Sequence, residues 1–459
     1  MRPPLLEGPY LVVGLARSGV AVCRALCGVV PDARIVACDI GHPAEAIEAT
    51  AELSELGVGV HLGTDGVELL DANPELQCVV KSPGVSQGAP VIAAARRRGL
   101  TVTGELEIAW RLLSNPFCAV TGTNGKTTTV ALIGAMLRAA GQPHVVAGNV
   151  GLAVASLVGR IDPEAVVVCE TSSFQLEDAI AFKPCLSVFL NFAADHLDRH
   201  GTIDGYLRAK LGVFANQREG DVALMNAREP LLNDVELPSG VERIYYAAGV
   251  VGGDRDLEIY ERDDAVWWRG TELIAVEEIR LRGTHNLENA MAAAGAALTL
   301  GAPTEAVAAT LREFSGVEHR LEEICEHRGV LFVDDSKATN VASARVAIEA
   351  FNSGVHLILG GSSKGSDFGA LREPVSRHCS AVYLIGAAAE RIASDLGDIG
   401  PRVNECNDLE RAVSEAAAAA ASGEVVLLSP ACASLDQYDN YEERGDHFHR
   451  IVQQLETHR

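Results

Sequence analysis

Short apolar runs recur along most of the chain, and stretches with helical periodicity separate many of them. Apolar runs without polar alternation are typical of strands that are buried on both faces of a parallel sheet. Helical stretches between such runs indicate crossover connections that cover the sheet. The pattern therefore predicts an α/β fold in which helices cover parallel sheets.

The runs fall into three regions, which we interpret as domains of residues 1–104, 105–315 and 316–459. The first has predicted strands at 10–13, 35–38, 58–61, 78–80 and 100–103, and helices at 20–30, 44–56 and 91–98. The second has strands at 117–120, 165–170 and 186–190, short strands between 222 and 279, and a long helix from about 283 to 300. The third has strands at 330–333, 356–359, 382–385 and 425–428, and a helix at 412–421. The alternation predicts Rossmann-like, doubly wound sheets for the first and third domains.

A glycine-rich segment, Thr121-Gly-Thr-Asn-Gly-Lys-Thr-Thr128, follows the strand at 117–120 and precedes an apolar helical run. We call residues 121–128 the phosphate loop, because a strand, a glycine loop and a helix N-terminus together direct backbone N–H groups at an anion. Lys126 can reach nucleotide phosphates, and the Thr127 hydroxyl can ligate Mg²⁺. Val120 replaces the first glycine of the strict pattern, so a glycine-rich turn with a chance lysine is the alternative. We predict nucleoside triphosphate binding and a P-loop ATPase-like central domain. The residues that would contact the nucleotide here are Gly122, Thr123, Asn124, Gly125, Lys126, Thr127 and Thr128.

A second glycine turn, Gly14-Leu-Ala-Arg-Ser-Gly19, follows the first strand, and Asp39 ends the next one. The turn resembles a dinucleotide fingerprint in which Ala16 replaces the second glycine. Its N–H groups suit a diphosphate, and Asp39 can accept a hydrogen bond from a ribose or a base. A purely structural tight turn is the alternative.

Polar residues also follow strands in the central region. Glu170 ends the strand at 165–170 and can hold Mg²⁺ beside the phosphate loop, although a helix cap or a surface glutamate fits the same pattern. Residues 191–201 include two histidines and two aspartates, without further ligands at a spacing typical of zinc. Lys210 lies in an apolar helical stretch and by itself indicates a surface lysine whose aliphatic stem covers apolar neighbours.

Three polar loops follow predicted strands of the third region, at residues 334–340, 360–368 and 429–438. Open parallel sheets bind ligands beyond the carboxyl ends of their strands, so these loops indicate a further binding site. Asn286 and Asn289 share one face of the preceding helix. They can hydrogen-bond a nucleotide, or they can cap and bridge helices.

The formal net charge of −24 disfavours nucleic acid and anionic membranes as partners, because the field of the protein repels both. The 11 cysteines include no CxxC pair, which is typical of reduced thiols. No apolar run approaches the roughly 18 residues of a spanning helix, and the N-terminal residues do not read as a signal peptide. We expect a cytoplasmic protein with no membrane span and no nucleic-acid partner, and we expect a monomer.

Taken together, these motifs resemble the Mur ligase family, which builds the peptide of bacterial cell-wall precursors. The segments that carry the resemblance are the phosphate loop, Glu170-Thr-Ser-Ser-Phe-Gln-Leu176, Asp195-His-Leu-Asp-Arg-His200, Tyr206-Leu-Arg-Ala-Lys210 and His319-Arg320. Three further segments resemble the members that add D-glutamate: Asp334-Asp-Ser-Lys-Ala-Thr-Asn340, Lys364-Gly-Ser-Asp-Phe368 and Ser429-Pro-Ala-Cys-Ala-Ser434. The Asp-x-Ala-His type of motif that other members carry in place of the first of these is absent. The resemblance extends over essentially the whole chain.

The resemblance implies a ligase that joins the L-alanine carboxylate of UDP-N-acetylmuramoyl-L-alanine to the amine of D-glutamate and splits ATP to ADP and phosphate. The carboxylate would take the γ-phosphoryl group to give an acyl phosphate, which the amine then attacks. The implied catalytic residues are Lys126, Glu170, His196 and Lys210. Thr127 and Glu170 would hold one Mg²⁺, and Glu170, His196 and Lys210 a second. Lys210 resembles the carbamylated lysine of the family, which is an anion that accepts Mg²⁺ where an ammonium would repel it.

The resemblance also assigns ligand contacts. Asn289, Arg320 and Asp335 match nucleotide-binding positions, with Asn286 as a weaker candidate. The positions implied for the incoming glutamate are Lys337, Thr339, Lys364, Ser434, Leu435 and Tyr441. Those implied for the UDP-linked substrate are Arg17, Ser18, Asp39, Gly84, Asn149 and His196. Ala16 and Ile40-Gly-His42 depart from the pattern of some relatives, so the uracil contacts are the least constrained.

Alternatives from other classes remain open on the sequence. A P-loop kinase or NTPase would turn over ATP without an amino acid, but it leaves the three loops of the third region unexplained. An NAD-binding oxidoreductase or a nucleotide sensor would use the first domain alone. Within the ligases, another acceptor such as L-glutamate is possible, because stereochemistry depends on the shape of the pocket.

Overall fold

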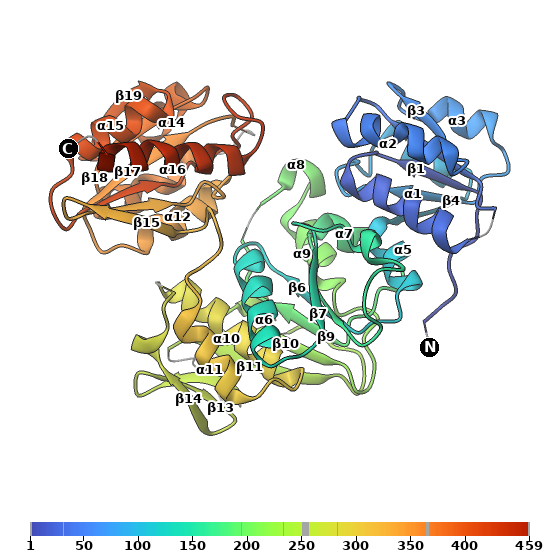
Figure 1. The fold of residues 1–459 in the computed structure, drawn as a ribbon, viewed down its shortest axis with the longest axis horizontal. Helices are drawn as coiled ribbons and strands as arrows, with labels where there is room; N and C mark the ends of the chain where they lie inside the picture. The colour runs from blue at the N-terminus through green and yellow to red at the C-terminus, as the bar shows by residue number, and fades with distance from the viewer. Residues whose placement is uncertain are drawn as a thin grey trace. The chain divides into compact units, whose positions relative to one another are not determined.

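The computed structural model describes residues 2–30, 32–193, 195–232, 234–249, 257–281, 283–363 and 367–457. Three sheets flanked by helices make up the chain, in agreement with the predicted α/β class (Figure 1). The chain divides into two compact units, which we call unit 1 (Met1–Glu278 and Glu288–Arg312) and unit 2 (Ile279–Leu287 and Glu313–Arg459). The first two sheets lie in unit 1 and the third lies in unit 2. The division into three domains at residues 104 and 315 stays a prediction.

The first sheet has five parallel strands in the order β3-β2-β1-β4-β5. Its strands are β1 (Tyr10–Val13), β2 (Ile35–Asp39), β3 (Gly59–Leu62), β4 (Cys78–Lys81) and β5 (Thr101–Gly104). Its helices are α1 (Arg17–Val29), α2 (Ala44–Glu55), α3 (Val67–Ala72) and α4 (Pro90–Arg97). Tyr10 and Val12 face one core cluster, whereas Leu11 and Val13 face another, so both faces of the sheet are buried as predicted. The helix α3 was not predicted, because six residues are too few to show helical periodicity.

The core on one face of the first sheet continues into the second. Helix α5 (Glu105–Leu112) packs against α1 and against the short 3₁₀ helix η1 (Val154–Leu157). Buried Lys81 on β4 forms an ion pair of 2.5 Å with Asp178, which is 3% exposed and follows helix α7 (Ser173–Glu177). A continuous apolar core and a buried ion pair thus join the two sheets into one unit.

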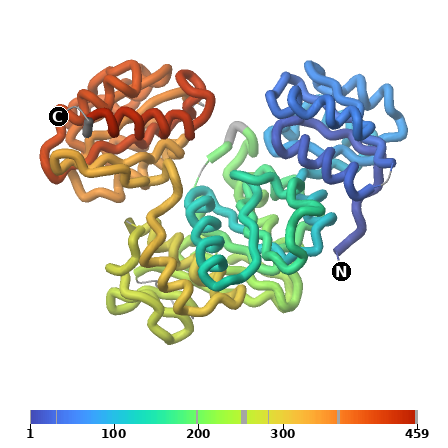
Figure 2. The backbone as a smooth tube through the Cα atoms, in the orientation of Figure 1, coloured from blue at the N-terminus to red at the C-terminus, as the bar shows by residue number. Residues whose placement is uncertain are grey.

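The second sheet has nine strands in the order β14-β13-β12-β11-β10-β9-β6-β8-β7. They are β6 (Phe117–Thr121), β7 (His144–Gly148), β8 (Val166–Glu170), β9 (Leu186–Phe189), β10 (Val222–Asn226), β11 (Glu242–Ala247), β12 (Ile259–Arg262), β13 (Ala265–Trp268) and β14 (Thr271–Ala275). The accompanying helices are α6 (Lys126–Ala139), α8 (Leu197–His200), α9 (Ile203–Leu211), α10 (Thr284–Thr299) and α11 (Thr304–Glu313), with the 3₁₀ turns η2 (Pro230–Leu232) and η3 (Val276–Glu278). The strands from β7 to β12 run parallel, and β13 and β14 add antiparallel hairpins at one edge. Figure 2 follows the chain through these elements in cyan, green and yellow.

The third sheet has six strands in the order β15-β16-β20-β17-β18-β19, and only the β15–β16 pair is antiparallel. They are β15 (Glu322–His327), β16 (Val330–Asp334), β17 (Val355–Gly360), β18 (Cys379–Ile385), β19 (Arg402–Asn407) and β20 (Val425–Leu428). The helices are α12 (Val341–Glu349), α13 (Arg372–His378), α14 (Ala389–Leu396), α15 (Leu409–Ala419) and α16 (Tyr441–Thr457), with the 3₁₀ helix η4 (Phe368–Leu371). Alternate strand residues face two separate core clusters, so this sheet is also covered on both faces. The edge strands β15 and β19 were not predicted, because polar residues fill most of their positions.

Among the residues with described structure, no helix combines the length and the apolar composition that crossing a membrane requires.

Candidate active site

The phosphate loop has the predicted strand–loop–helix form. Strand β6 ends at Thr121, and α6 begins at Lys126. Gly122 and Gly125 have φ values of +149° and +84°, a region that favours glycine. At Gly125, a Cβ atom would lie 2.1 Å from Oδ1 of Asn289 on α10. Both the backbone conformation and this close approach therefore require glycine at position 125.

The segment after β9 fastens the phosphate loop. Asn191 accepts a hydrogen bond from the backbone N–H of Asn124 through Oδ1 (2.9 Å) and donates to the Asn124 carbonyl through Nδ2 (3.1 Å). The hydroxyl of Thr123 accepts a hydrogen bond from the N–H of Ala193 (3.0 Å). Because β9 pairs directly with β6, this segment is held beside the loop by the sheet itself.

Two lysines donate to one carbonyl oxygen of the loop. Nζ of Lys126 lies 2.9 Å from the carbonyl oxygen of Gly122, and Nζ of Lys210 lies 2.6 Å from the same atom. Lys210 is only 1% exposed, and its Nζ lies 4.6 Å from the centre of the Tyr206 ring. Burial lowers the pKa of Lys210 well below its usual value, and the charge of Lys126 lowers it further.

The interpretation of Lys210 as a surface lysine, which its apolar neighbours alone suggested, is wrong. Helix α9 buries this side chain under the phosphate loop instead of exposing it. An apolar helical context fits both a snorkelling lysine and a fully buried one, so the local pattern does not separate them.

Glu170 lies beside the phosphate loop, as its position at a strand end predicted. It is 2% exposed, which excludes the surface alternative. Its Oε2 accepts a hydrogen bond from the Thr127 hydroxyl (2.8 Å), and its Oε1 accepts one from Nδ2 of Asn149 (3.1 Å). The next helix is capped by Ser172 rather than by Glu170. A carboxylate next to a threonine hydroxyl is a donor set that suits Mg²⁺.

His196 lies in the turn before α8 and has a left-handed backbone, with φ of +52°. Its ring packs edge-on against Phe174, with 4.9 Å between centroids. The guanidinium of Arg199 lies over the same Phe174 ring, 4.6 Å from its centre. Arg199 also donates to the backbone oxygens of Pro83, Gly84 and Val85 at 3.1, 3.2 and 2.6 Å. Arg199 thereby links the His196 segment to the first sheet, a role that its sequence context did not indicate.

The first glycine turn is tightly built at the carboxyl end of β1. Asp39 accepts hydrogen bonds from the N–H groups of Leu15 (2.7 Å) and Gly41 (2.8 Å) with its two carboxylate oxygens. A Cβ at Gly19 would lie 1.9 Å from the Gly14 carbonyl oxygen, so the turn needs glycine there. Arg17 and Ser18 follow at the start of α1, and Arg17 donates to the Gly151 carbonyl at 3.4 Å. Asp39 thus has a structural role in the turn, whatever ligand the turn binds.

In unit 2, Arg320 lines a cavity of about 540 Å³ together with Arg280, Asn286 and Glu322. Asp335, the other predicted nucleotide contact in this unit, is 3% exposed and accepts a hydrogen bond from the Ser429 hydroxyl (2.8 Å). Burial raises the pKa of Asp335 to about 7, and the charge of Arg320 opposes that rise. The structure therefore brings Arg320 and Asp335 within electrostatic reach of each other.

The polar loops that follow strands of the third sheet lie together. Arg444 on α16 is 1% exposed and donates to the backbone oxygens of Ser336 (2.7 Å) and Cys432 (3.2 Å), which joins two of the loops. Ser362 and Ala433 form an antiparallel bridge that joins the third. No motif marked Arg444, because one arginine in a polar helix is most often a surface residue.

The residues predicted to contact glutamate lie on these loops or at the start of α16. Nζ of Lys337 lies 5.2 Å from the ring centre of Tyr441, and the N–H of Thr339 donates to the Lys337 carbonyl (2.8 Å). Ser434 is 3% exposed, whereas Leu435 is 68% exposed. The predicted contact Lys364 lies outside the described residues.

Two family models match the chain. The model for the Mur ligase middle domain matches residues 120–297, and the model for the Mur ligase glutamate ligase domain matches residues 319–432. These stretches contain the phosphate loop, Glu170, Lys210, the loops at 334–340 and 360–368, and the first part of the loop at 429–438. The chain belongs to the Mur ligase family.

Among its relatives, the chain is similar to three proteins named UDP-N-acetylmuramoylalanine–D-glutamate ligase. The protein of Geobacillus kaustophilus is 39% identical and that of Pelotomaculum thermopropionicum is 41% identical, each over 97% of both chains. The protein of Anaeromyxobacter dehalogenans is 42% identical over 98% of this chain and 99% of its own.

Solved structures share the fold. The UDP-N-acetylmuramate–alanine ligase of Thermotoga maritima aligns over 98% of this chain and 100% of its own, with a TM-score of 0.59 and 20% identity. A MurF ligase of the same organism, solved in complex with ADP, aligns over 83% of this chain and 96% of its own, with a TM-score of 0.58 and 18% identity.

We predict that Gly125→Ala destabilises the protein more than Gly141→Ala. Gly125 precedes α6 and Gly141 follows it, and both have positive φ, but a Cβ at Gly141 would meet no atom within 4 Å. The control should lose about 1–2 kcal/mol of unfolding free energy from the left-handed conformation alone. Gly125→Ala adds the collision with Asn289, and overpacking of this kind typically costs a further loss of about 1–3 kcal/mol of unfolding free energy. Urea denaturation of both variants measures the difference, and equal losses would show that the Asn289 contact does not matter.

Proposed function

We propose that this protein is the ATP-dependent ligase that adds D-glutamate to UDP-N-acetylmuramoyl-L-alanine in peptidoglycan precursor synthesis. The observation that carries the proposal is the phosphate loop with the Thr127–Glu170 contact beside it. The chain also aligns over nearly its whole length with relatives that are named for this reaction. The proposed setting is the cytoplasm, and the proposed form is a monomer.

ATP occupies the phosphate loop in this proposal. The loop N–H groups and Lys126 bind the β- and γ-phosphates, and Asn289 adjoins the loop at Gly125. Arg320 and Asp335, both in unit 2, are further proposed nucleotide-binding residues. Mg²⁺ neutralises phosphate charge when it is bound, and Thr127 with Glu170 provides oxygen ligands for one ion. Glu170, His196 and Lys210 are the proposed ligands of a second ion.

The protein activates a carboxylate, which is by itself a poor electrophile. An oxygen of the L-alanyl carboxylate attacks the γ-phosphorus, ADP leaves, and an acyl phosphate forms. The amine of D-glutamate then attacks the acyl carbon, loses a proton, and displaces inorganic phosphate to leave the amide. Lys126 and the loop N–H groups hold the phosphoryl group in line and stabilise its charge, so the protein acts by positioning and electrostatics.

The two substrates occupy the ends of strands in different sheets. Arg17, Ser18, Asp39 and Gly84 bind the UDP portion at the first glycine turn, and Asn149 and His196 contact the muramoyl portion. The proposed glutamate contacts are Lys337, Thr339, Lys364, Ser434, Leu435 and Tyr441. A lysine among these contacts makes a charge-assisted pair with a carboxylate of the bound glutamate, which favours glutamate over an amino acid with a neutral side chain.

Phosphate release measured with Mg²⁺, ATP and UDP-N-acetylmuramoyl-L-alanine tests this function. We expect release to depend on D-glutamate and to accompany a UDP product heavier by one glutamyl residue. L-Glutamate, meso-diaminopimelate and L-lysine serve as matched acceptors and should give no amide product. Turnover without any amino acid would instead identify an NTPase or kinase, and turnover with another acceptor alone would identify a different ligase.

We also propose that Lys210 is carbamylated. Its Nζ shares the Gly122 carbonyl oxygen with Nζ of Lys126, and burial together with that neighbour lowers the pKa of Lys210. A lowered pKa leaves the amine neutral at moderate pH, and a neutral amine attacks CO₂ to form a carbamate with release of one proton. The carbamate is an anion beside Lys126, which replaces repulsion by attraction and creates a ligand for Mg²⁺.

Removal of CO₂ should therefore lower ligase activity, and bicarbonate should restore it. Lys210→Gln should lose activity by on the order of 10²-fold or more, the cost of removing one charge-stabilising group, and should not respond to bicarbonate. The control is Lys183→Gln, because Lys183 pairs with Asp221 (2.7 Å) away from the loop. ¹³C NMR with labelled bicarbonate should show a carbamate signal in the parent and in the control but not in Lys210→Gln. A carbamate signal that persists in Lys210→Gln, or activity that ignores CO₂, would contradict the proposal.

A further inference from the structure

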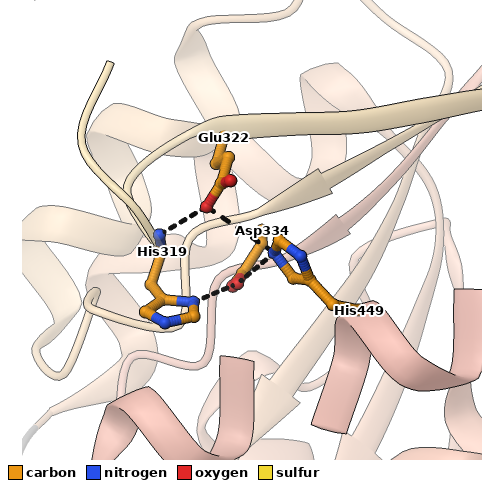
Figure 3. A group of neighbouring side chains, drawn as sticks. All are labelled: His319, Glu322, Asp334 and His449. Atoms are coloured by element: carbon orange, nitrogen blue, oxygen red, sulfur yellow. Dashed lines mark hydrogen bonds and ion pairs between the residues drawn. The ribbon is translucent and has the colours of Figure 1, made fainter. Parts of the chain in front are cut away.

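Unit 2 contains a cluster of two imidazoles and two carboxylates that the proposed reaction does not use. We call His319, Glu322, Asp334 and His449 the histidine–carboxylate cluster (Figure 3). His319 precedes β15, Glu322 begins β15, Asp334 ends β16, and His449 comes from α16. One potential ligand atom from each residue lies within 4.8 Å of those of the other three. Segments about 115 residues apart in sequence thus place four possible metal ligands at one point.

The separations of His449 from the two carboxylates suit a tetrahedral ion. Nε2 of His449 lies 3.2 Å from Oδ2 of Asp334 and 3.6 Å from Oε2 of Glu322. Four ligands at about 2.1 Å from a tetrahedral Zn²⁺ stand roughly 3.4 Å from one another, which these two separations bracket. Nδ1 of His319 lies 2.7 Å from Oδ2 of Asp334, a hydrogen-bond distance. The distance between these two atoms must increase by less than about 1 Å for both to bind one ion, which a small movement of the side chains allows.

Hydrogen bonds pair some of the polar atoms of the cluster but not all of them. Oδ1 of Asp334 accepts from the N–H of Ser336 (2.8 Å), and Oδ2 accepts from His319. Nε2 of His449 is shielded from solvent, and among the described residues it makes no aligned hydrogen bond although it faces both carboxylates. Asp334 is completely buried, so its charge requires a nearby positive partner. A cation between the rings and the carboxylates satisfies both His449 and Asp334.

A further carboxylate lies near the ring of His319. Its Nε2, on the side away from Asp334, lies 3.7 Å from Oδ1 of Asp446. Metal-binding histidines commonly direct their second ring nitrogen to a carboxylate, which sets the tautomer and the ring orientation. The backbone of α16 also presses against the cluster, because a Cβ at Gly445 would lie 2.1 Å from Nδ1 of His319. Glycine at 445 thus allows the helix to bring His449 to the other three residues.

We propose that the histidine–carboxylate cluster binds Zn²⁺, or a transition-metal ion of similar preference, and that this ion fastens α16 to β15 and β16. Two imidazole nitrogens favour such an ion over Mg²⁺, which prefers oxygen ligands. His319 and Asp334 directly precede Arg320 and Asp335, so the ion also fixes the backbone on which both lie. That last consequence rests on the proposed nucleotide role of Arg320 and Asp335, whereas the metal site itself does not.

The test uses full-length protein without a polyhistidine tag, stripped with a chelator and returned to excess Mg²⁺. Zn²⁺ is titrated by calorimetry, and Co²⁺ reports coordination through its visible spectrum. His449→Ala removes one ligand. His447→Ala is the matched control, because it lies on the same helix and Nδ1 of His447 pairs with the Tyr438 hydroxyl (2.9 Å). Glu322→Gln is a second variant. In the parent, the backbone N–H of His319 donates to Oε2 of Glu322 (2.8 Å), and the amide oxygen of the glutamine can still accept this hydrogen bond.

We expect the parent and His447→Ala to bind one equivalent of Zn²⁺ more tightly than His449→Ala, by at least about 100-fold. Zn²⁺ should raise the melting temperature of the parent and the control but not of His449→Ala or Glu322→Gln. The intense spectrum of tetrahedral Co²⁺ should be lost in both of these variants. Equal Zn²⁺ affinity in the parent and His449→Ala, no tight Zn²⁺ binding by the parent, or a weak octahedral Co²⁺ spectrum would each overturn the proposal. None of these readouts depends on ligase activity, so they are independent of the proposed function.

Discussion

The carbonyl oxygen of Gly122 is the point on which two lysine side chains of the phosphate-loop region converge. Nζ of Lys126 and Nζ of Lys210 both lie within hydrogen-bond distance of it, and Lys210 is buried there. The buried ammonium of Lys210 and the partly buried one of Lys126 repel each other, so the arrangement favours a neutral or modified Lys210 and negative charge next to Lys126. The sheet order β8-β6-β9 sets Glu170 and Asn191 on either side of the loop. That order places the Glu170 carboxylate next to the phosphate loop.

Much of the fold was predictable, because buried parallel strands appear in the sequence as short apolar runs. The polar edge strands β15 and β19 and the short helix α3 lack that signal and were not predicted. The phosphate loop and Glu170 were also predictable, since a glycine loop and a strand-end carboxylate are local features. Their contact, from the Thr127 hydroxyl to Oε2 of Glu170, follows from strand order, which the apolar pattern did not specify.

Residues that act over long sequence distances could not be predicted from local patterns. No local pattern indicated the roles of Arg199 and Arg444, yet each joins loops that only the folded sheets bring together. Lys210 read as a surface lysine, and only its resemblance to a family motif indicated otherwise. His449 and Asp334 are 115 positions apart, and the two histidines of α16 look alike in the sequence, so nothing marks His449 as the one with partners on a distant hairpin. Burial and tertiary contact, rather than composition, define these roles.

Transfer of oxygen from the alanyl carboxylate of the UDP-linked substrate to phosphate tests the central claim that the phosphate loop activates a carboxylate rather than water. UDP-N-acetylmuramoyl-L-alanine labelled with ¹⁸O in the alanyl carboxylate is turned over with Mg²⁺, ATP and D-glutamate, and the released phosphate is analysed by mass spectrometry. An acyl phosphate intermediate predicts one ¹⁸O atom in each phosphate that is released. Phosphate that carries no label would contradict the account, because its new oxygen would then come from water.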